Sequence, residues 1–173
     1  MDPLTGWAQA AREGDPVAVD ALVRATQVEV WRLCAALVDR DSADDLAQET
    51  YLRALGALGS YEGRAPFRVW LLSIARRTCM DALRGRMRRR GLLSRLQSRP
   101  VADAPAADTH AVASGTLAAL DPDRRAAFVL TQLLGLSYQE AAQACEVPIG
   151  TIRSRVARAR EQLVAAHRAE ESG

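Results

Sequence analysis

The sequence predicts an all-α protein of two small helical domains joined by a flexible linker. Apolar residues recur at helical spacing along most of the 173 residues, whereas the alternating patterns typical of strands are missing. Asp-Pro pairs, in which Asp can cap a helix whose first residue is Pro, stand at 15–16 and 121–122. Residues 97–114 contain two prolines and almost no large apolar side chain, which is typical of an interdomain linker.

Composition excludes several classes of protein. The 49% apolar and 25% charged residues are the balance of an ordinary globular chain, not of a chain disordered throughout. No apolar run approaches the roughly 20 residues of a membrane span, and the N-terminus lacks the features of a signal peptide. We therefore expect a cytosolic protein that does not insert into a membrane. Three separated cysteines, Cys34, Cys79 and Cys145, and two histidines predict buried thiols, no metal site and no cofactor.

Charge is segmented along the chain. All 23 basic residues are Arg. Residues 1–60 carry a net charge of −5, whereas residues 61–99 carry +9, and a second group of arginines lies within 153–160. One acidic and two basic surfaces indicate different partners at different places on the molecule.

The first predicted helix begins at Pro16 and continues to about Leu37 on an apolar stripe. A second helix is predicted from Ser42, where Asp45 completes a variant capping box, to about Gly59. We expect its inward stripe to comprise Ala47, Tyr51, Ala54, Leu55 and Leu58. A different face, at i, i+3, i+4 and i+7 spacing, carries Asp45, Gln48, Glu49 and Leu52.

A glycine-containing loop at 60–65 precedes a third predicted helix, from Pro66 to about Arg86. Phe67 and Trp70 fall on the apolar stripe of this helix, so we interpret both rings as core. Tyr61, in the loop, is the better candidate for stacking on a nucleobase. The helix ends in a basic run at 84–90, which either contacts phosphates, the role we favour, or keeps the end of the domain soluble.

The second half of the chain predicts a helix-turn-helix. A helix from Pro122 stops at Gly135, and Ser137 with Glu140 forms a full capping box for the next, short helix. Pro148 interrupts that helix, and an arginine-rich helix follows. The alternative is a solvated helix that merely carries arginines, but the cap and turn favour DNA binding. Its outward residues are the candidates for contact with the major groove: Thr151, Arg153, Ser154, Arg155, Ala157 and Arg158.

Four strings carry a family resemblance: SADDLAQETYLRA at 42–54, FRVWLLSIAR at 67–76, LSYQEAA at 136–142 and GTIRSRVARAR at 150–160. In this order they resemble the extracytoplasmic-function (ECF) sigma factors, small alternative sigma subunits of bacterial RNA polymerase, and actinobacterial members above all. The resemblance covers nearly the whole chain apart from the linker and the last residues. It implies sigma region 2 over 1–96, a linker over 97–114 and sigma region 4 over 115–173, with no catalytic site.

The resemblance also implies partners and site residues. The partners are the polymerase core, through the clamp helices of its largest subunit and its flap, promoter DNA, and often an anti-sigma protein. The clamp helices are expected to contact Asp44, Asp45, Gln48, Glu49 and Leu52, although the first two also complement the helix dipole. The minus-ten element is expected to contact Tyr61, Glu62, Arg64, Ala65, Arg76, Arg77 and Arg84. The groove candidates listed above are expected to read the minus-thirty-five element.

Two positions depart from the family pattern, and one other reading stays open. Many relatives carry Asn where this chain has Arg77, and some carry a bulky residue where it has Ala157, so its promoter preference is expected to differ. The alternative function is a stand-alone helix-turn-helix regulator, which would not require the face that carries Gln48 and Glu49. An enzyme is disfavoured because no acid, base, nucleophile, metal or phosphate-loop constellation is found.

Overall fold

The computed structural model describes residues 2–97 and 115–171, and it confirms the all-α prediction over these ranges. The predicted linker therefore lies outside the described residues apart from residue 97. The long helices are α1 (Pro3–Arg12), α2 (Pro16–Leu37), α3 (Arg40–Ala57), α4 (Phe67–Leu96) and α8 (Ile149–Glu171). The shorter elements are η1 (Leu58–Ser60), α5 (Gly115–Ala118), α6 (Pro122–Phe128), η2 (Val129–Leu133) and α7 (Tyr138–Cys145).

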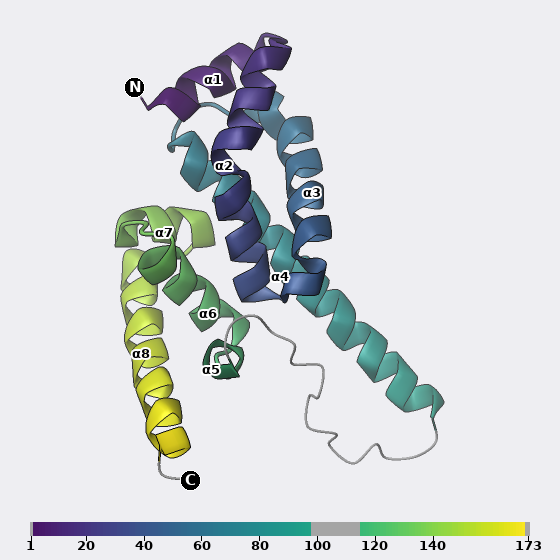
Figure 1. The fold of residues 1–173 in the computed structure, drawn as a ribbon, viewed down its shortest axis with the longest axis vertical. Coiled ribbons are helices and arrows are strands. Elements are labelled where there is room, and N and C mark those ends of the chain that lie inside the picture. The colour runs from purple at the N-terminus through teal and green to yellow at the C-terminus, as the bar shows by residue number, and fades with distance from the viewer. Residues whose placement is uncertain (1, 98–114, 172–173) are drawn as a thin grey trace.

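Helices α1 to α4 form the N-terminal unit, in which α2 and α3 pack against each other and against α4 while α1 crosses their upper end (Figure 1). The core is aliphatic, and Val30, Leu33 and Leu72 are almost completely buried in it. Helix α1 was not among the predicted helices. Its start repeats the Asp-Pro pattern used elsewhere, because Asp2 caps a helix whose first residue is Pro3.

Three details of the N-terminal prediction are wrong. Helix α3 begins at Arg40 and not at Ser42, because Asp39 is the cap and accepts a hydrogen bond from the Ser42 amide at 2.7 Å. Leu55 is 41% exposed and does not belong to the inward stripe, because it shares the outer face of α3 with Gln48, seven residues earlier. Helix α4 runs ten residues beyond the predicted end at Arg86, since the arginines that follow are good helix formers.

The C-terminal unit consists of α5 to α8. Gly135 adopts a φ of +71° where the chain turns from η2 towards α7. The predicted capping box at Ser137 and Glu140 is confirmed: the Ser137 amide donates to Glu140 Oε2 at 2.8 Å, and the Glu140 amide donates to Ser137 Oγ at 3.1 Å. Helix α7 ends at Cys145, and Glu146, which caps it, adopts a left-handed conformation with φ of 57°; α8 starts at Ile149. The short turn between α7 and α8 is thus the turn of the predicted helix-turn-helix.

The two units pack against each other. Helix α7 lies on α4, and α6 and η2 lie on α2 (Figure 1). Arg125 of α6 reaches the C-terminal end of α2, where it donates to the carbonyl oxygen of Leu37 at 3.0 Å. The same guanidinium donates to the carbonyl oxygens of Ala118 and Leu120, while its Nε is buried without a hydrogen-bond partner. Burial lowers the pKa of Arg125.

The three cysteines are free and buried, as expected. Burial raises the pKa of the Cys145 thiol, and contact with Cys34 raises that of Cys79, so neither forms a thiolate readily. Within the described ranges no group of three or more potential ligands could hold a metal ion. None of the helices described here is long and apolar enough to cross a membrane.

Candidate functional site

The outer face of α3 brings together the residues predicted to contact the polymerase. Asp44, Asp45, Gln48 and Leu52 are exposed, and Glu49 is half-buried beside them. Leu52 is 65% exposed. The face therefore offers hydrogen-bond acceptors beside two accessible apolar side chains, Leu52 and Leu55, which suits docking against a basic partner with an apolar contact.

Trp31 on α2 supports this face and was missed by the sequence analysis. Its indole Nε1 donates to Asp44 Oδ1 at 3.0 Å, and the guanidinium of Arg40 lies 5.7 Å from its ring centroid. A groove of about 410 Å³ between α2 and α3 runs beside it, lined by Val23, Gln27, Val28, Trp31, Asp44, Ala47 and Tyr51. No pattern in the sequence indicated this role, because Trp31 lies next to the apolar stripe of its helix.

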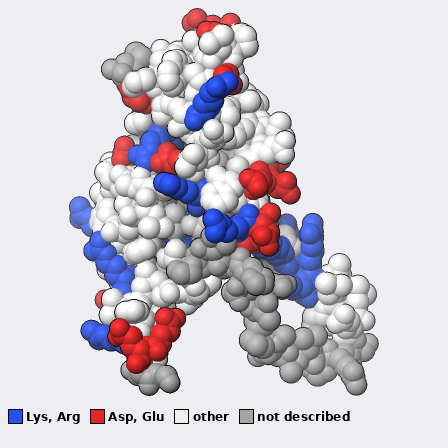
Figure 2. All heavy atoms as spheres, viewed as in Figure 1, with Lys and Arg blue, Asp and Glu red and all other residues white. Residues whose placement is uncertain are grey.

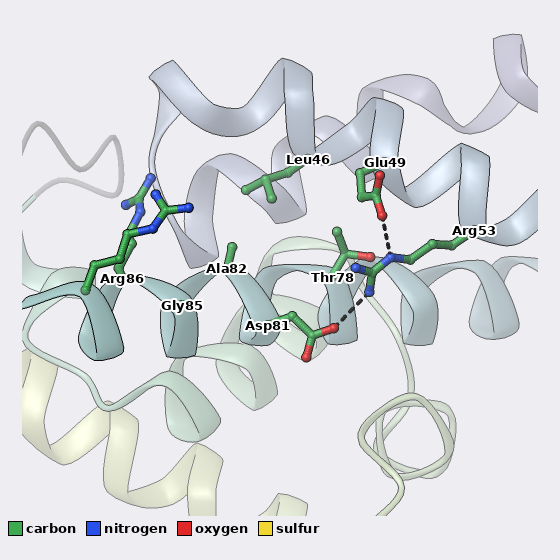
Figure 3. Close-up of a pocket in the computed structure, with 9 residues that line it drawn as sticks. Leu46, Glu49, Arg53, Thr78, Asp81, Ala82, Gly85 and Arg86 are labelled. Carbon is green, nitrogen blue, oxygen red and sulfur yellow. Dashed lines mark hydrogen bonds and ion pairs between the residues drawn. The ribbon is translucent and has the colours of Figure 1, made fainter. Parts of the chain in front are cut away.

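A second groove, of about 380 Å³, separates α3 from α4 (Figure 3). Arg53 spans it, since its Nε donates to Glu49 at 2.7 Å and its Nη1 donates to Asp81 at 2.8 Å. Asp81 also accepts a hydrogen bond from Arg84 at 2.5 Å. The hydrogen bonds from Arg53 and Arg84 lower the pKa of Asp81, and those to Asp81 and Glu49 raise the pKa of Arg53.

The ring of Tyr61 is 3% exposed, so in this structure it has no accessible face for the predicted stacking on a nucleobase. Its hydroxyl donates to the carbonyl oxygen of Ala65 at 2.7 Å, which closes the loop on itself. The ring packs 5.7 Å from Phe67 and 5.1 Å from Trp70, centroid to centroid. Phe67 is buried, as predicted, and Trp70 is half-buried. Hydrogen bonding and ring packing thus make Tyr61 the anchor of the loop.

Two further residues of the loop are accessible. Glu62 and Arg64 are exposed and form an ion pair with each other at 2.6 Å. Arg84 is also exposed, although it is paired with Asp81. The side chains of Glu62, Arg64 and Arg84 are therefore accessible to a DNA strand that lies along the loop and α4.

The structure places Arg76 and Arg77 against the helix-turn-helix. Arg76 Nε donates to the carbonyl oxygen of Ala144 in α7 at 3.1 Å, and only 13% of its side chain is exposed. Arg77 pairs with Glu146 in the turn, and Arg76 lies 4.0 Å from the same carboxylate. Arg68, which the sequence analysis did not assign, pairs with Glu29 and donates to the carbonyl oxygen of Leu134. Predicted promoter contacts thus lie at the junction of the two units.

Most groove candidates on α8 are accessible. Arg153, Ser154, Ala157 and Arg158 are exposed, and Thr151 is half-buried. Arg155 differs, because it turns towards α6 and pairs with Asp123 at 3.5 Å. The predicted inward residues Ile152, Val156 and Ala159 are buried. Figure 2 shows basic side chains along the edge formed by α8 and on the C-terminal half of α4, before its white tip.

An acidic α3 face, an arginine-bearing helix and a helix-turn-helix on one all-α chain are the features expected of a DNA-binding protein of the sigma-70 type. Matches to two protein families support this class: "Sigma-70 region 2" at residues 22–89 and "Sigma-70, region 4" at residues 114–163.

The chain is 42% identical to the "ECF RNA polymerase sigma factor SigC" of Mycobacterium tuberculosis, over 95% of this chain and 91% of that relative. It belongs to the extracytoplasmic-function family of RNA polymerase sigma factors. Its fold resembles that of CnrH in a complex with the cytosolic domain of CnrY (TM-score 0.76, 28% identity, 97% of this chain and 99% of that one). It also resembles RpoE in a complex with the anti-sigma factor NepR from Bartonella quintana (TM-score 0.64, 28% identity, 83% and 92% covered).

Proposed function

We propose that this chain confers promoter specificity on RNA polymerase core, with sigma region 2 over 1–96, a linker over 97–114 and sigma region 4 over 115–173. The single observation that carries the proposal is the accessible α3 face around Gln48, Glu49 and Leu52. A stand-alone helix-turn-helix regulator has no use for such a face. In the proposed role the face docks on the clamp helices of the largest polymerase subunit, with Asp44 and Asp45 at its edge. The chain itself performs no catalytic step.

The loop at 61–65 and the adjacent face of α4 are proposed to hold the melted minus-ten element. Extruding one base from the duplex costs a few kcal/mol, which contacts with the strand must offset. Glu62, Arg64, Arg76, Arg77 and Arg84 supply the polar contacts, and Ala65 leaves room for the backbone of the strand. Tyr61 contributes indirectly, because it fixes the shape of the loop.

The N-terminal half of α8 is proposed to read the minus-thirty-five element in the major groove. Arg153 and Arg158 are the long donors on its exposed face, while Thr151, Ser154 and Ala157 allow the helix to come close to the bases. Arg155 joins these contacts once it leaves Asp123, and before that it fixes α8 on α6.

The packed arrangement occupies two of the proposed minus-ten contacts. Arg76 donates to the carbonyl oxygen of Ala144 in α7, and Arg77 pairs with Glu146 in the turn that follows. Both arginines would have to leave these partners in order to contact a DNA strand. We propose that core binding is accompanied by opening of this junction.

An anti-sigma partner is proposed for this chain as well. Both similar structures named above are complexes with a second protein, which in the RpoE complex is the anti-sigma factor NepR, and the similarity extends over most of this chain. The exposed α3 face and the outer face of α8 are the surfaces that such a partner would have to cover.

Run-off transcription with purified core polymerase and a promoter library tests the proposal. The wild-type chain should start transcripts from a defined subset of promoters only when core is present. The double variant Gln48→Ala with Glu49→Ala should lose core affinity in a pull-down while its helix content, measured by circular dichroism, stays unchanged. Specific binding to duplex DNA without core, together with no transcript from any promoter, would support the regulator instead.

A further inference from the structure

A chain of ion pairs crosses the groove between α3 and α4. Arg53 Nε donates to Glu49 Oε1 within α3, and Arg53 Nη1 donates to Asp81 Oδ2 on α4. Figure 3 shows the guanidinium of Arg53 between the two carboxylates, with Thr78 beside it and Leu46 and Ala82 farther along the groove. One arginine side chain is therefore held at two points by two different helices.

This arrangement fixes the Glu49 carboxylate and still leaves it able to accept a further hydrogen bond. Among the residues described, Arg53 is the partner of Glu49 Oε1, and Oε2 accepts no hydrogen bond. The Glu49 side chain stays 46% exposed. Ordering a long side chain when a partner binds costs free energy, so a carboxylate that is already ordered and has a vacant oxygen is preorganised for an incoming donor.

Arg53 is itself suited to this task. The planar guanidinium presents donors in a rigid fork, so one group can bind two carboxylates in fixed directions, which a lysine ammonium does less well. Asp81 is bound in turn by Arg84, which limits the freedom of the carboxylate that holds Arg53. The position of Glu49 on α3 thus depends on a residue of α4, 32 positions away.

We propose that Arg53 is a positioning residue that presents Glu49 to a basic group of the polymerase core, and that Asp81 holds Arg53 in place for this purpose. This inference rests on the proposed function, in which the α3 face docks on core. It assigns a part in core binding to Asp81, although Asp81 lies on the helix that faces the promoter.

The direction in which core affinity changes when Arg53 is removed separates a positioning role from a purely electrostatic one. If Arg53 only adds positive charge, or only masks Glu49, its removal should strengthen attraction to a basic partner. If Arg53 positions Glu49, its removal should weaken core binding even though the face becomes more acidic. Long-range electrostatics and positioning therefore predict opposite changes in the dissociation constant.

The experiment measures the affinity of fluorescently labelled full-length chain for purified core polymerase. Arg53→Met should weaken binding about two- to five-fold, the range expected for the loss of an exposed ion pair. Asp81→Asn should weaken it in the same direction, and Arg53→Lys should restore part of the loss. Arg24→Met is the matched control, because Arg24 forms a similar i,i+4 pair with Asp20 at 2.8 Å on α2, and it should bind core as the wild type does.

A double-mutant cycle completes the test. In a Glu49→Gln background, Arg53→Met should cause no further loss of affinity, since there is no carboxylate left to position. Unchanged or tighter binding by Arg53→Met, or additive losses in the double variant, would overturn the inference while leaving the proposed function intact. A wild-type chain that does not bind core would instead refute the proposed function.

Discussion

Glu146, the left-handed residue in the turn of the helix-turn-helix, has two separable effects on the molecule. A residue other than glycine in this conformation costs roughly 1 kcal/mol. Its carboxylate also pairs with Arg77 across the junction of the two units, with 56% of the Glu146 side chain and 50% of the Arg77 side chain exposed. An ion pair with that exposure contributes about 0.2–1 kcal/mol.

Glu146→Gly should therefore relieve the backbone cost and remove the ion pair at once. We expect the free energy of unfolding to stay the same or to rise by up to about 0.8 kcal/mol, the difference between the two contributions. The closed arrangement of the two units should become less populated, by up to about five-fold for a loss of 1 kcal/mol. Glu146→Gln is the control, because it keeps the backbone cost and loses only the charge, so it should open the junction and also lower stability.

Chemical denaturation measures the stability of the three proteins, and small-angle scattering or energy transfer between dyes on α4 and α8 measures the opening. A glycine variant that is as unstable as the glutamine variant would show that the left-handed backbone carries no cost here. If both variants stay as closed as the wild type, the pair between Glu146 and Arg77 does not hold the junction.

Three further predictions concern the N-terminal unit. Leu33→Ala should lower the free energy of unfolding by about 2–5 kcal/mol in urea denaturation, because the side chain is completely buried and leaves a cavity. Tyr51→Phe should cost about 1 kcal/mol, since the hydroxyl bonds Thr26 at 2.7 Å. Burial raises the pKa of Tyr51, so the wild type should lose stability as the pH rises above about 10, and the Phe variant should lack this part of the loss. Burial acts to raise the pKa of Asp39, but the hydrogen bond from Arg86 lowers it, and the net pKa is lowered. The ionised carboxylate should therefore stabilise the fold fully above about pH 4, and this stabilisation should disappear on further acidification. The Asp39→Ala variant should not show this loss of stability in an acid titration.

The sequence predicted the parts of this fold that depend on local chemistry. The capping box at Ser137 and Glu140 needs only neighbouring side chains and amides, and the structure contains both of its hydrogen bonds. The same local logic misplaced the start of α3, because Ser42 and Asp39 both suit a cap and only the packing of α3 on α2 and α4 decides between them. The buried stripe of α8 could be predicted because its period repeats over several turns.

What the sequence could not provide was the environment of the arginines and of Tyr61. Periodicity places Arg76 and Arg77 outside the core stripe of α4, but it does not say that α7 covers that side. Tyr61 lies in a loop, and loops are usually exposed, yet its ring completes an aromatic cluster with side chains of the next helix. The burial of these side chains depends on packing between elements that are distant in the sequence. The spacing of residues along a single helix or loop cannot predict such packing.

Besides the Arg77–Glu146 pair, the junction between the two units contains arginines of α4 and α6 that donate to main-chain oxygens of Leu134, Ala144 and Leu37. A carbonyl oxygen is present whatever side chain its residue carries. Related chains can therefore exchange the side chains at these three acceptor positions and still retain the bonds, as long as the helices keep their course. Evolutionary constraint on these three hydrogen bonds should therefore fall on the donor side chains. The loss of one of the bonds in a lineage would be visible as the replacement of Arg68, Arg76 or Arg125.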